Sequence, residues 1–144
     1  MKIFIGADHG GFELKKDLIE YLKSQGHDVE DKGNTVHDPV DDYPDFAKKV
    51  AQAVLQDPES LGILACRTAD GMAITANRFK GIRCGVGVSV PQVTRSRRDD
   101  RINILAIQGD YTDLETAKEM IEAFFTAEFK TDEKYMRRIK KIDE

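Results

Sequence analysis

The residue in this sequence with the clearest capacity for chemistry is Cys66, which closes an apolar run over 61–65. A polar, glycine-containing segment, 67–71, follows at once, a pattern typical of a buried strand that ends in a turn. In open α/β sheets, ligands bind in the crevice outside the carboxyl ends of the strands. A thiol at such a strand end, with Thr68 two residues further on, is a candidate acid, base or nucleophile. A second interpretation stays open, since free cysteines are also among the most frequently buried core residues.

A second group of candidates lies near the end of the chain. Residues 130–141 hold six lysines and arginines against two acidic residues. A charge run of this kind is most often the solvated face of a helix. The alternative is a small anion site, in which two or three of the cations meet a phosphate.

The composition limits what these residues can belong to. With 144 residues, 40% of them hydrophobic, the chain fits one domain over 1–144 with a core of its own. Its two cysteines and three histidines show no ligand spacing, so we expect no disulfide, metal or other cofactor. A net charge of −4 argues against nonspecific nucleic-acid binding. Neither a signal segment nor a run long enough to span a bilayer is evident, so we expect a cytoplasmic protein without membrane contact.

The elements that must position Cys66 alternate along the chain. Apolar runs predict strands over 2–6, 28–31, 61–65, 82–88 and 102–107. Helical spacing predicts helices around 14–22, 44–54, 72–79, 91–98, 114–125 and 135–142, the fifth capped by Thr112 and Glu115 in a capping box. This alternation predicts a three-layer αβα sandwich: a doubly wound, Rossmann-like α/β fold with a five-stranded parallel sheet and a C-terminal helix. The segments 7–11, 66–71, 88–91 and 108–110 should then gather along one edge of the sheet.

The same segments resemble a known family. The matching stretches, in order, are Gly6-Ala7-Asp8-His9-Gly10-Gly11-Phe12-Glu13-Leu14-Lys15, Asp42-Tyr43-Pro44, Gly62-Ile63-Leu64, Ala76-Asn77-Arg78, Gly81-Ile82-Arg83, Asn103-Ile104-Leu105-Ala106 and Arg138-Ile139. Their content and spacing resemble ribose-5-phosphate isomerase type B, whose family includes the galactose-6-phosphate isomerase subunits. The resemblance implies a metal-independent aldose–ketose isomerisation of a sugar phosphate through an enediolate. It also implies a homodimer, or a tetramer, whose active sites combine residues of both subunits.

The resemblance also assigns roles to individual residues. Cys66 matches the proton-shuttling cysteine, which would need a lowered pKa to work as a thiolate, and Thr68 its neighbouring hydroxyl. The turn through Gly71 would offer backbone N–H groups to the developing oxyanion. The remaining matches are substrate contacts: Asp8, His9 near the phosphate, Tyr43 in the pocket wall, and Lys134 and Arg138 as phosphate-binding cations.

The chain departs from the family pattern within the site itself. Arg67 and Ala69 stand where the family has glycines, Asp99 where it has the ring-opening histidine, Asp100 where it has an asparagine, and Asp110 where it has an arginine. Asp99 either keeps a ring-opening role as a base or only pairs with Arg97, Arg98 or Arg67. Asp110 removes a phosphate contact, and Arg67 could restore that charge from another direction. Asp70 is best explained as the cap of the helix that follows.

Three functions therefore compete. The leading hypothesis is an isomerase of a small phosphorylated aldose or ketose. The second is a silent family member that binds a sugar phosphate, or one subunit of a hetero-oligomeric isomerase. A nucleotide-binding protein fits the fold pattern but is disfavoured, because no GxGxxG or Walker loop follows any strand.

Overall fold

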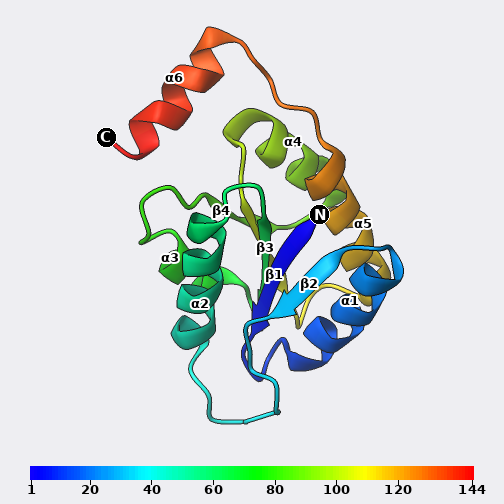
Figure 1. The fold of residues 1–144 in the computed structure, drawn as a ribbon. Coiled ribbons are helices and arrows are strands. Elements are labelled where there is room, and N and C mark those ends of the chain that lie inside the picture. Colours follow the sequence, from blue (N-terminus) through cyan, green and yellow to red (C-terminus); the bar gives the residue numbers. More distant parts are fainter.

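The computed structural model describes residues 1–144 and contains a single five-stranded sheet (Figure 1). Its strands run in the order β2-β1-β3-β5-β4, and every neighbouring pair is parallel. The strands are β1 (Lys2–Ala7), β2 (Asp28–Asp31), β3 (Leu61–Cys66), β4 (Cys84–Gly87) and β5 (Ile104–Gln108). The predicted five-stranded parallel sheet is confirmed, and all its carboxyl ends lie at one edge.

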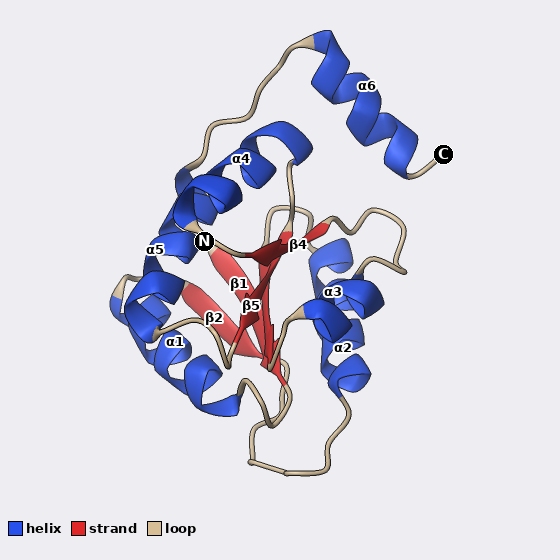
Figure 2. Ribbon diagram, turned by 180° about the vertical axis from the view of Figure 1, so that it is seen from behind, coloured by secondary structure: helices blue, strands red, loops and turns tan.

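Helices cover both faces of this sheet (Figure 2). They are α1 (Phe12–Ser24), α2 (Tyr43–Gln56), α3 (Asp70–Ala76), α4 (Val90–Asp100), α5 (Leu114–Thr126) and α6 (Glu133–Ile142). Helices α2 and α3 pack on one face and α1, α4 and α5 on the other, and each face has its own buried apolar cluster. The three-layer αβα prediction is therefore confirmed. No helix has the length and apolar character needed to cross a membrane.

Strand β3 shows why this sequence forms a central strand. All six of its residues are buried, as expected for a strand covered on both faces. Successive side chains point to opposite faces, so Ile63 joins the cluster under α1, α4 and α5, while Leu64 joins the one under α2 and α3. The continuous apolar run thus fills two cores at once and delivers Cys66 to the sheet edge.

Several predicted boundaries differ in the structure for local reasons. The N-cap of α5 is Asp113 rather than Thr112: its carboxylate accepts a hydrogen bond from the Thr116 N–H at 2.8 Å, which leaves Glu115 too early in the helix to answer a cap. Helix α3 ends at Ala76 rather than near 79, because the chain then turns toward Gly81, whose φ of 90° is left-handed. Strand β4 is shorter than predicted and, at the sheet edge, pairs only with β5.

Helix α6 stands apart from the layers, at the end of an extended connection from α5 (Figure 1). None of its residues is buried, although its apolar residues share one face. These residues are Tyr135, Met136, Ile139 and Ile142, and Met136 and Ile142 are 40% and 54% exposed. An amphipathic helix is normally stabilised by covering its apolar face, which α6 does not do within this chain.

Candidate active site

The loops after β1, β3 and β5 meet at the carboxyl edge of the sheet, as predicted. The Gly109 N–H donates to the Cys66 carbonyl at 2.8 Å, and the Asp110 N–H donates to the Arg67 carbonyl at 3.1 Å. A side chain at Gly109 would place its Cβ only 2.6 Å from the carbonyl oxygen of Gly10, so the approach of the β1 and β5 loops requires glycine. These contacts hold the loops after β1, β3 and β5 together around the end of β3.

The Cys66 thiol lies at that point and is only 5% exposed. Burial raises its pKa and the nearby Asp8 carboxylate adds to the effect, while the N–H groups of Thr68, Ala69 and Met72 oppose it without cancelling it. The thiol is therefore protonated at neutral pH in the free chain, in contrast to the lowered pKa that thiolate chemistry would need. The three N–H groups nevertheless form a ready anion cradle around the sulfur.

The turn after Cys66 has alanine at a position whose left-handed backbone conformation favours glycine. Ala69 is left-handed, with φ of 68°, and is the N-cap of α3. Asp70 follows in the first turn without a side-chain capping bond, so its prediction as a cap is wrong, although its charge still suits a helix N-terminus. Gly71 lies against the ring of Tyr43, because an added Cβ would come within 2.7 Å of that ring. The Tyr43 ring therefore packs against the turn whose backbone N–H groups, that of Thr68 included, face the Cys66 sulfur.

Asp8 lies beside the thiol on the β1 loop and is 5% exposed. Its Oδ1 accepts from the Gly10 N–H at 2.8 Å. Burial raises the pKa of Asp8, and the negative charge of Asp41 raises it further, while hydrogen bonds from Gly10 and Gly11 and the charge of His9 oppose the shift. Burial therefore favours the protonated form of both Asp8 and Cys66 relative to the same groups in water.

His9 is fixed by a residue that the sequence analysis did not select, Asp41. The Asp41 Oδ1 accepts from both His9 Nδ1 at 2.8 Å and the His9 backbone N–H at 2.9 Å. This hydrogen bond raises the pKa of His9. Burial alone would raise the pKa of Asp41, but the bonds from His9 and Asn34 outweigh it and the pKa is lowered. The contact with Asp41 thus favours the cationic form of the His9 ring.

The segment that carries Asp41 is tied down by a buried lysine, Lys15, which is 2% exposed. Its Nζ donates to the two carboxylate oxygens of Asp31 at 2.8 and 2.9 Å, and also to the Asn34 carbonyl. The Asn34 side chain in turn donates to Asp41 Oδ2 at 3.2 Å. A chain of polar contacts therefore runs from α1 to His9.

Asp8, His9 and Asp41 also offer three ligand atoms within 4.8 Å of one another, the spacing of a metal site. The Nδ1 atom of His9, however, already donates to Asp41. Hydrogen bonding accounts for this cluster, so it gives no separate reason to place a metal there.

Arg67 and Asp110 form an ion pair. At these two positions the chain gains and loses a positive charge, respectively, relative to the family pattern. The Arg67 Nη1 lies 3.3 Å from each carboxylate oxygen of Asp110. The two side chains are 61% and 40% exposed, so the pair sits at the mouth of the site, where solvent weakens it.

Four predicted site residues do not reach Cys66 within one chain. Helix α4 runs from the carboxyl edge to the amino edge and carries Asp99 and Asp100 to its far end. Asp99 accepts from Arg98 at 3.0 Å and Arg95 at 3.3 Å, and its bond from Arg98 lowers its pKa. The expected pairing thus exists with Arg98, and with Arg95 instead of Arg97 or Arg67.

Asp99 and Asp100 line a groove along the outer face of α4, together with Gln92 and Arg95. The last two of the four, Lys134 and Arg138, lie on α6 around the ring of Tyr135, at 5.1 and 5.9 Å from its centre.

The sequence and the structure of this chain are similar to those of known isomerases. The model of the family described as Ribose/Galactose Isomerase matches residues 3–142. Ribose-5-phosphate isomerase B of Mycobacterium tuberculosis is 35% identical over 96% of this chain and 86% of its own. A crystal structure of ribose 5-phosphate isomerase from Thermotoga maritima superposes with a TM-score of 0.94 at 39% identity, over 99% of this chain and 97% of that one.

A further solved structure carries a ligand. Ribose-5-phosphate isomerase B of Mycoplasma genitalium, with bound ribulose-5-phosphate, superposes with a TM-score of 0.93 at 36% identity. It covers 98% of this chain and 93% of its own. The likeness thus extends from sequence to structure over nearly the whole chain, and the chain belongs to the ribose/galactose isomerase family.

Proposed function

We propose that this protein is an aldose–ketose isomerase that interconverts ribose 5-phosphate and ribulose 5-phosphate. The observation that carries the proposal is the full-length likeness to ribose-5-phosphate isomerases B, one of them with ribulose-5-phosphate bound. The position of Cys66 supports it: the thiol lies at a carboxyl strand end, in a cradle of N–H groups and beside a carboxyl group.

In the proposed reaction, Cys66 removes the proton from C2 of the open-chain aldose and returns it to C1, while the proton of the C2 hydroxyl passes to the C1 oxygen at the enediolate stage. The thiol must first give up its own proton, because its pKa is raised in the free chain. Asp8, whose charge acts on the thiol and whose own pKa is raised, is the acceptor that we propose for that proton. The N–H groups of Thr68, Ala69 and Met72 stabilise the thiolate or an enediolate oxygen beside it. The Thr68 hydroxyl is exposed and free to contact the sugar.

His9 is proposed to bind the phosphate, because Asp41 orients its ring and raises its pKa. Lys134 and Arg138 would add their charges from α6, and Asp100 would contact the substrate. Asp99 would act as the base in ring opening. Its pKa is lowered by Arg98, so it can accept a proton at neutral pH but cannot donate one.

These last four residues reach Cys66 only from a second copy of the chain, so we propose a homodimer with shared active sites. Two observations support this assembly. The apolar face of α6 is uncovered within one chain, and α4 carries Asp99 and Asp100 away from their own Cys66. A twofold dimer uses the same surface on both copies, so one contact would complete two sites.

The test is to assay the purified chain on ribose 5-phosphate and ribulose 5-phosphate. Cys66→Ala should lower kcat by at least about a thousandfold. Cys84→Ala is the matched control, since that thiol lies far from the loops and burial raises its pKa to about 12. Full activity of the Cys66→Ala variant would contradict the mechanism.

Shared sites can be tested by mixing two inactive variants, Cys66→Ala and Asp99→Ala. If subunits exchange freely, half of the dimers are mixed and each has one intact site, so about a quarter of the normal activity should return. No recovery after confirmed exchange would show that each site is built within one chain.

A silent sugar-phosphate binder remains the second candidate, favoured by the acidic Asp110 at the mouth of the site. Thermal stabilisation by ribose 5-phosphate without turnover, in a chain shown to dimerise, would select this candidate over the isomerase.

A further inference from the structure

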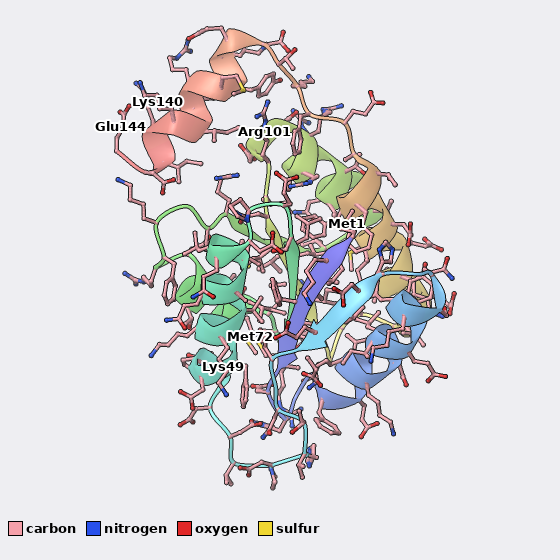
Figure 3. The ribbon with its side chains drawn as sticks, viewed as in Figure 1. Met1, Lys49, Met72, Arg101, Lys140 and Glu144 are labelled. Carbon is pink, nitrogen blue, oxygen red and sulfur yellow. The ribbon has the colours of Figure 1, made fainter.

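A second concentration of positive charge lies at the amino edge of the sheet, opposite the catalytic loops. A cavity of about 500 Å³ opens there between the start of β1, the turn before β3 and the end of α4, and it is lined by Arg83, Arg97 and Arg101. In Figure 3, Arg101 and Met1 mark this end, and Met72, whose N–H faces the Cys66 sulfur, lies toward the other. Strand β3 separates the two edges by about 16–20 Å, given about 3.3 Å per residue.

The three guanidinium groups have no acidic partner. None of the chain's ion pairs involves them. Arg83 Nε donates to the carbonyls of Asp100 and Arg101 at 3.1 Å, and Arg97 donates to the Ile102 carbonyl. The Nε atoms of Arg97 and Arg101 are buried without any hydrogen-bond partner. Burial, together with the charges of the other two arginines, lowers the pKa of Arg97 to about 10.

The surroundings hold these charges together but do not neutralise them. The ring of Phe129 lies between two guanidinium groups, 4.6 Å from that of Arg97 and 4.7 Å from that of Arg101. Two carboxylates lie nearby: exposed Glu59 in the cavity wall, and Asp143, which faces Arg83 but accepts a hydrogen bond from the Gly81 N–H.

Favourable contact with the carboxyl end of α4 explains only part of the cluster of Arg83, Arg97 and Arg101. The carbonyl oxygens at the end of α4 carry about half a negative charge, which suits one cation. Three arginines exceed this by far, and buried donors without partners are rare in folded proteins. The remaining guanidinium edges line an open cavity, of a volume typical of small-molecule sites.

The cavity is also separate from the proposed catalytic site. Arg97 lies two positions along α4 from Arg95 and Asp99, which places it on the opposite face of the helix, and Arg101 follows the helix as its left-handed C-cap. Asp99 lines the outer groove that we assign to the partner's site, and the arginines line the inner cavity.

We propose that this cavity is a binding site for a phosphate-bearing anion, either inorganic phosphate or a small phosphate monoester. Guanidinium groups match phosphate oxygens with paired, charge-assisted hydrogen bonds, and a dianion would balance most of the excess charge. Bound phosphate would meet the guanidinium edges that line the cavity, while the Nε atoms of Arg97 and Arg101 stay buried behind them. The proposal does not depend on the isomerase activity.

The test is calorimetric titration of the intact protein with inorganic phosphate at constant ionic strength, with chloride as the control anion. Arg101→Gln should weaken phosphate binding at this site by at least about tenfold. It should leave the KM for ribose 5-phosphate within twofold of normal. Glutamine is preferred to glycine there, because Arg101 adopts a left-handed backbone that glycine would relax. Arg101→Glu supplies an internal carboxylate, so it should abolish binding and raise the melting temperature without phosphate.

Arg138→Gln serves as the matched control, because it removes a cation of the proposed catalytic site. It should raise the KM for ribose 5-phosphate and leave the Arg101-dependent phosphate binding intact. The inference is overturned if Arg101→Gln binds phosphate like the normal protein, or if Arg101→Gln raises KM while Arg138→Gln does not. Binding is read without turnover, so an inactive chain would refute the proposed function and leave this site standing.

Discussion

The ion pair between Arg67 and Asp110 offers the sharpest test of how this chain holds a sugar phosphate. Asp110 replaces an arginine that the family resemblance places near the phosphate, so its carboxylate should repel the substrate. The pair is exposed, at 61% and 40%, with 3.3 Å between the charged atoms. Exposed pairs of this kind contribute about 0–1 kcal/mol to folding. Breaking the pair should therefore leave the fold intact, so that a change in KM reports on substrate binding.

The informative change is Asp110→Asn, which removes one negative charge and keeps the shape. At about 6–8 Å in water, a single charge and a phosphate dianion interact by about 1–1.4 kcal/mol, which screening at physiological salt reduces to about 0.4–0.7 kcal/mol. The KM for ribose 5-phosphate should therefore fall about two- to threefold. It should fall further if the freed Arg67 turns toward the phosphate.

The assay is a set of initial rates against ribose 5-phosphate concentration at low and high salt. Asp17→Asn is the matched control, because this exposed residue on α1 carries the same charge far from the loops. Arg67→Gln should raise KM, and the double variant should return it toward normal. The gain from Asp110→Asn should fade at about 0.5 M salt, where the Debye length is about 4 Å. An unchanged KM, or a gain that salt does not affect, would refute the reasoning.

Three further predictions concern the loops around Cys66. His9 is charged below its raised pKa, so its contribution to phosphate affinity should be lost as pH rises through that pKa. Asp41→Asn should lower the pKa of His9, so the rise in KM should begin at a lower pH than in the normal protein. Identical plots of KM against pH for the two proteins would count against this role. Lys15→Met leaves the Asp31 carboxylate without its partner and should lower the free energy of unfolding in urea by about 2–4 kcal/mol. The double variant with Asp31→Asn should recover part of that cost, and a loss below about 1 kcal/mol would disprove the buried-pair argument. Gly71→Ala puts a methyl group 2.7 Å from a tyrosine ring and should lower kcat/KM about tenfold with little loss of stability, as thermal unfolding can check.

The sequence predicted the fold well where the physics is local. The run 61–65 is apolar because β3 is buried on both faces, and its end at Cys66 coincides with the end of the strand. The strand order could not be predicted in the same way: β5 inserts between β3 and β4, and no pattern within either segment encodes that neighbour. The N-cap of α5 was predicted one residue too early, because Thr112 and Asp113 are both good cap residues and only the position where the helix begins distinguishes them.

The candidate site could be selected from the sequence only one position at a time. Cys66, Thr68, Asp8 and His9 could be selected from their place at strand ends and from the family resemblance. The contact of Asp41 with His9 spans 32 residues and depends on how Lys15 anchors the intervening loop, so no spacing rule could reveal it.

The exchanged charges show a different limit of sequence reasoning. Arg67 and Asp110 were each recognised as unusual, but not as partners, because their contact depends on the β3 and β5 loops running side by side.

If Asp99 takes part in ring opening as we propose, the chemistry of that step must be divided between several groups. A histidine can both remove the anomeric proton and protonate the ring oxygen, because its pKa lies near neutrality. Asp99 is held ionised by Arg98 and Arg95, so it can serve only the first of these steps. The ring oxygen must then receive its proton from another group in the proposed shared site. The Thr68 hydroxyl and the Asp8 carboxyl group, whose pKa is raised, are the donors that we propose for this step.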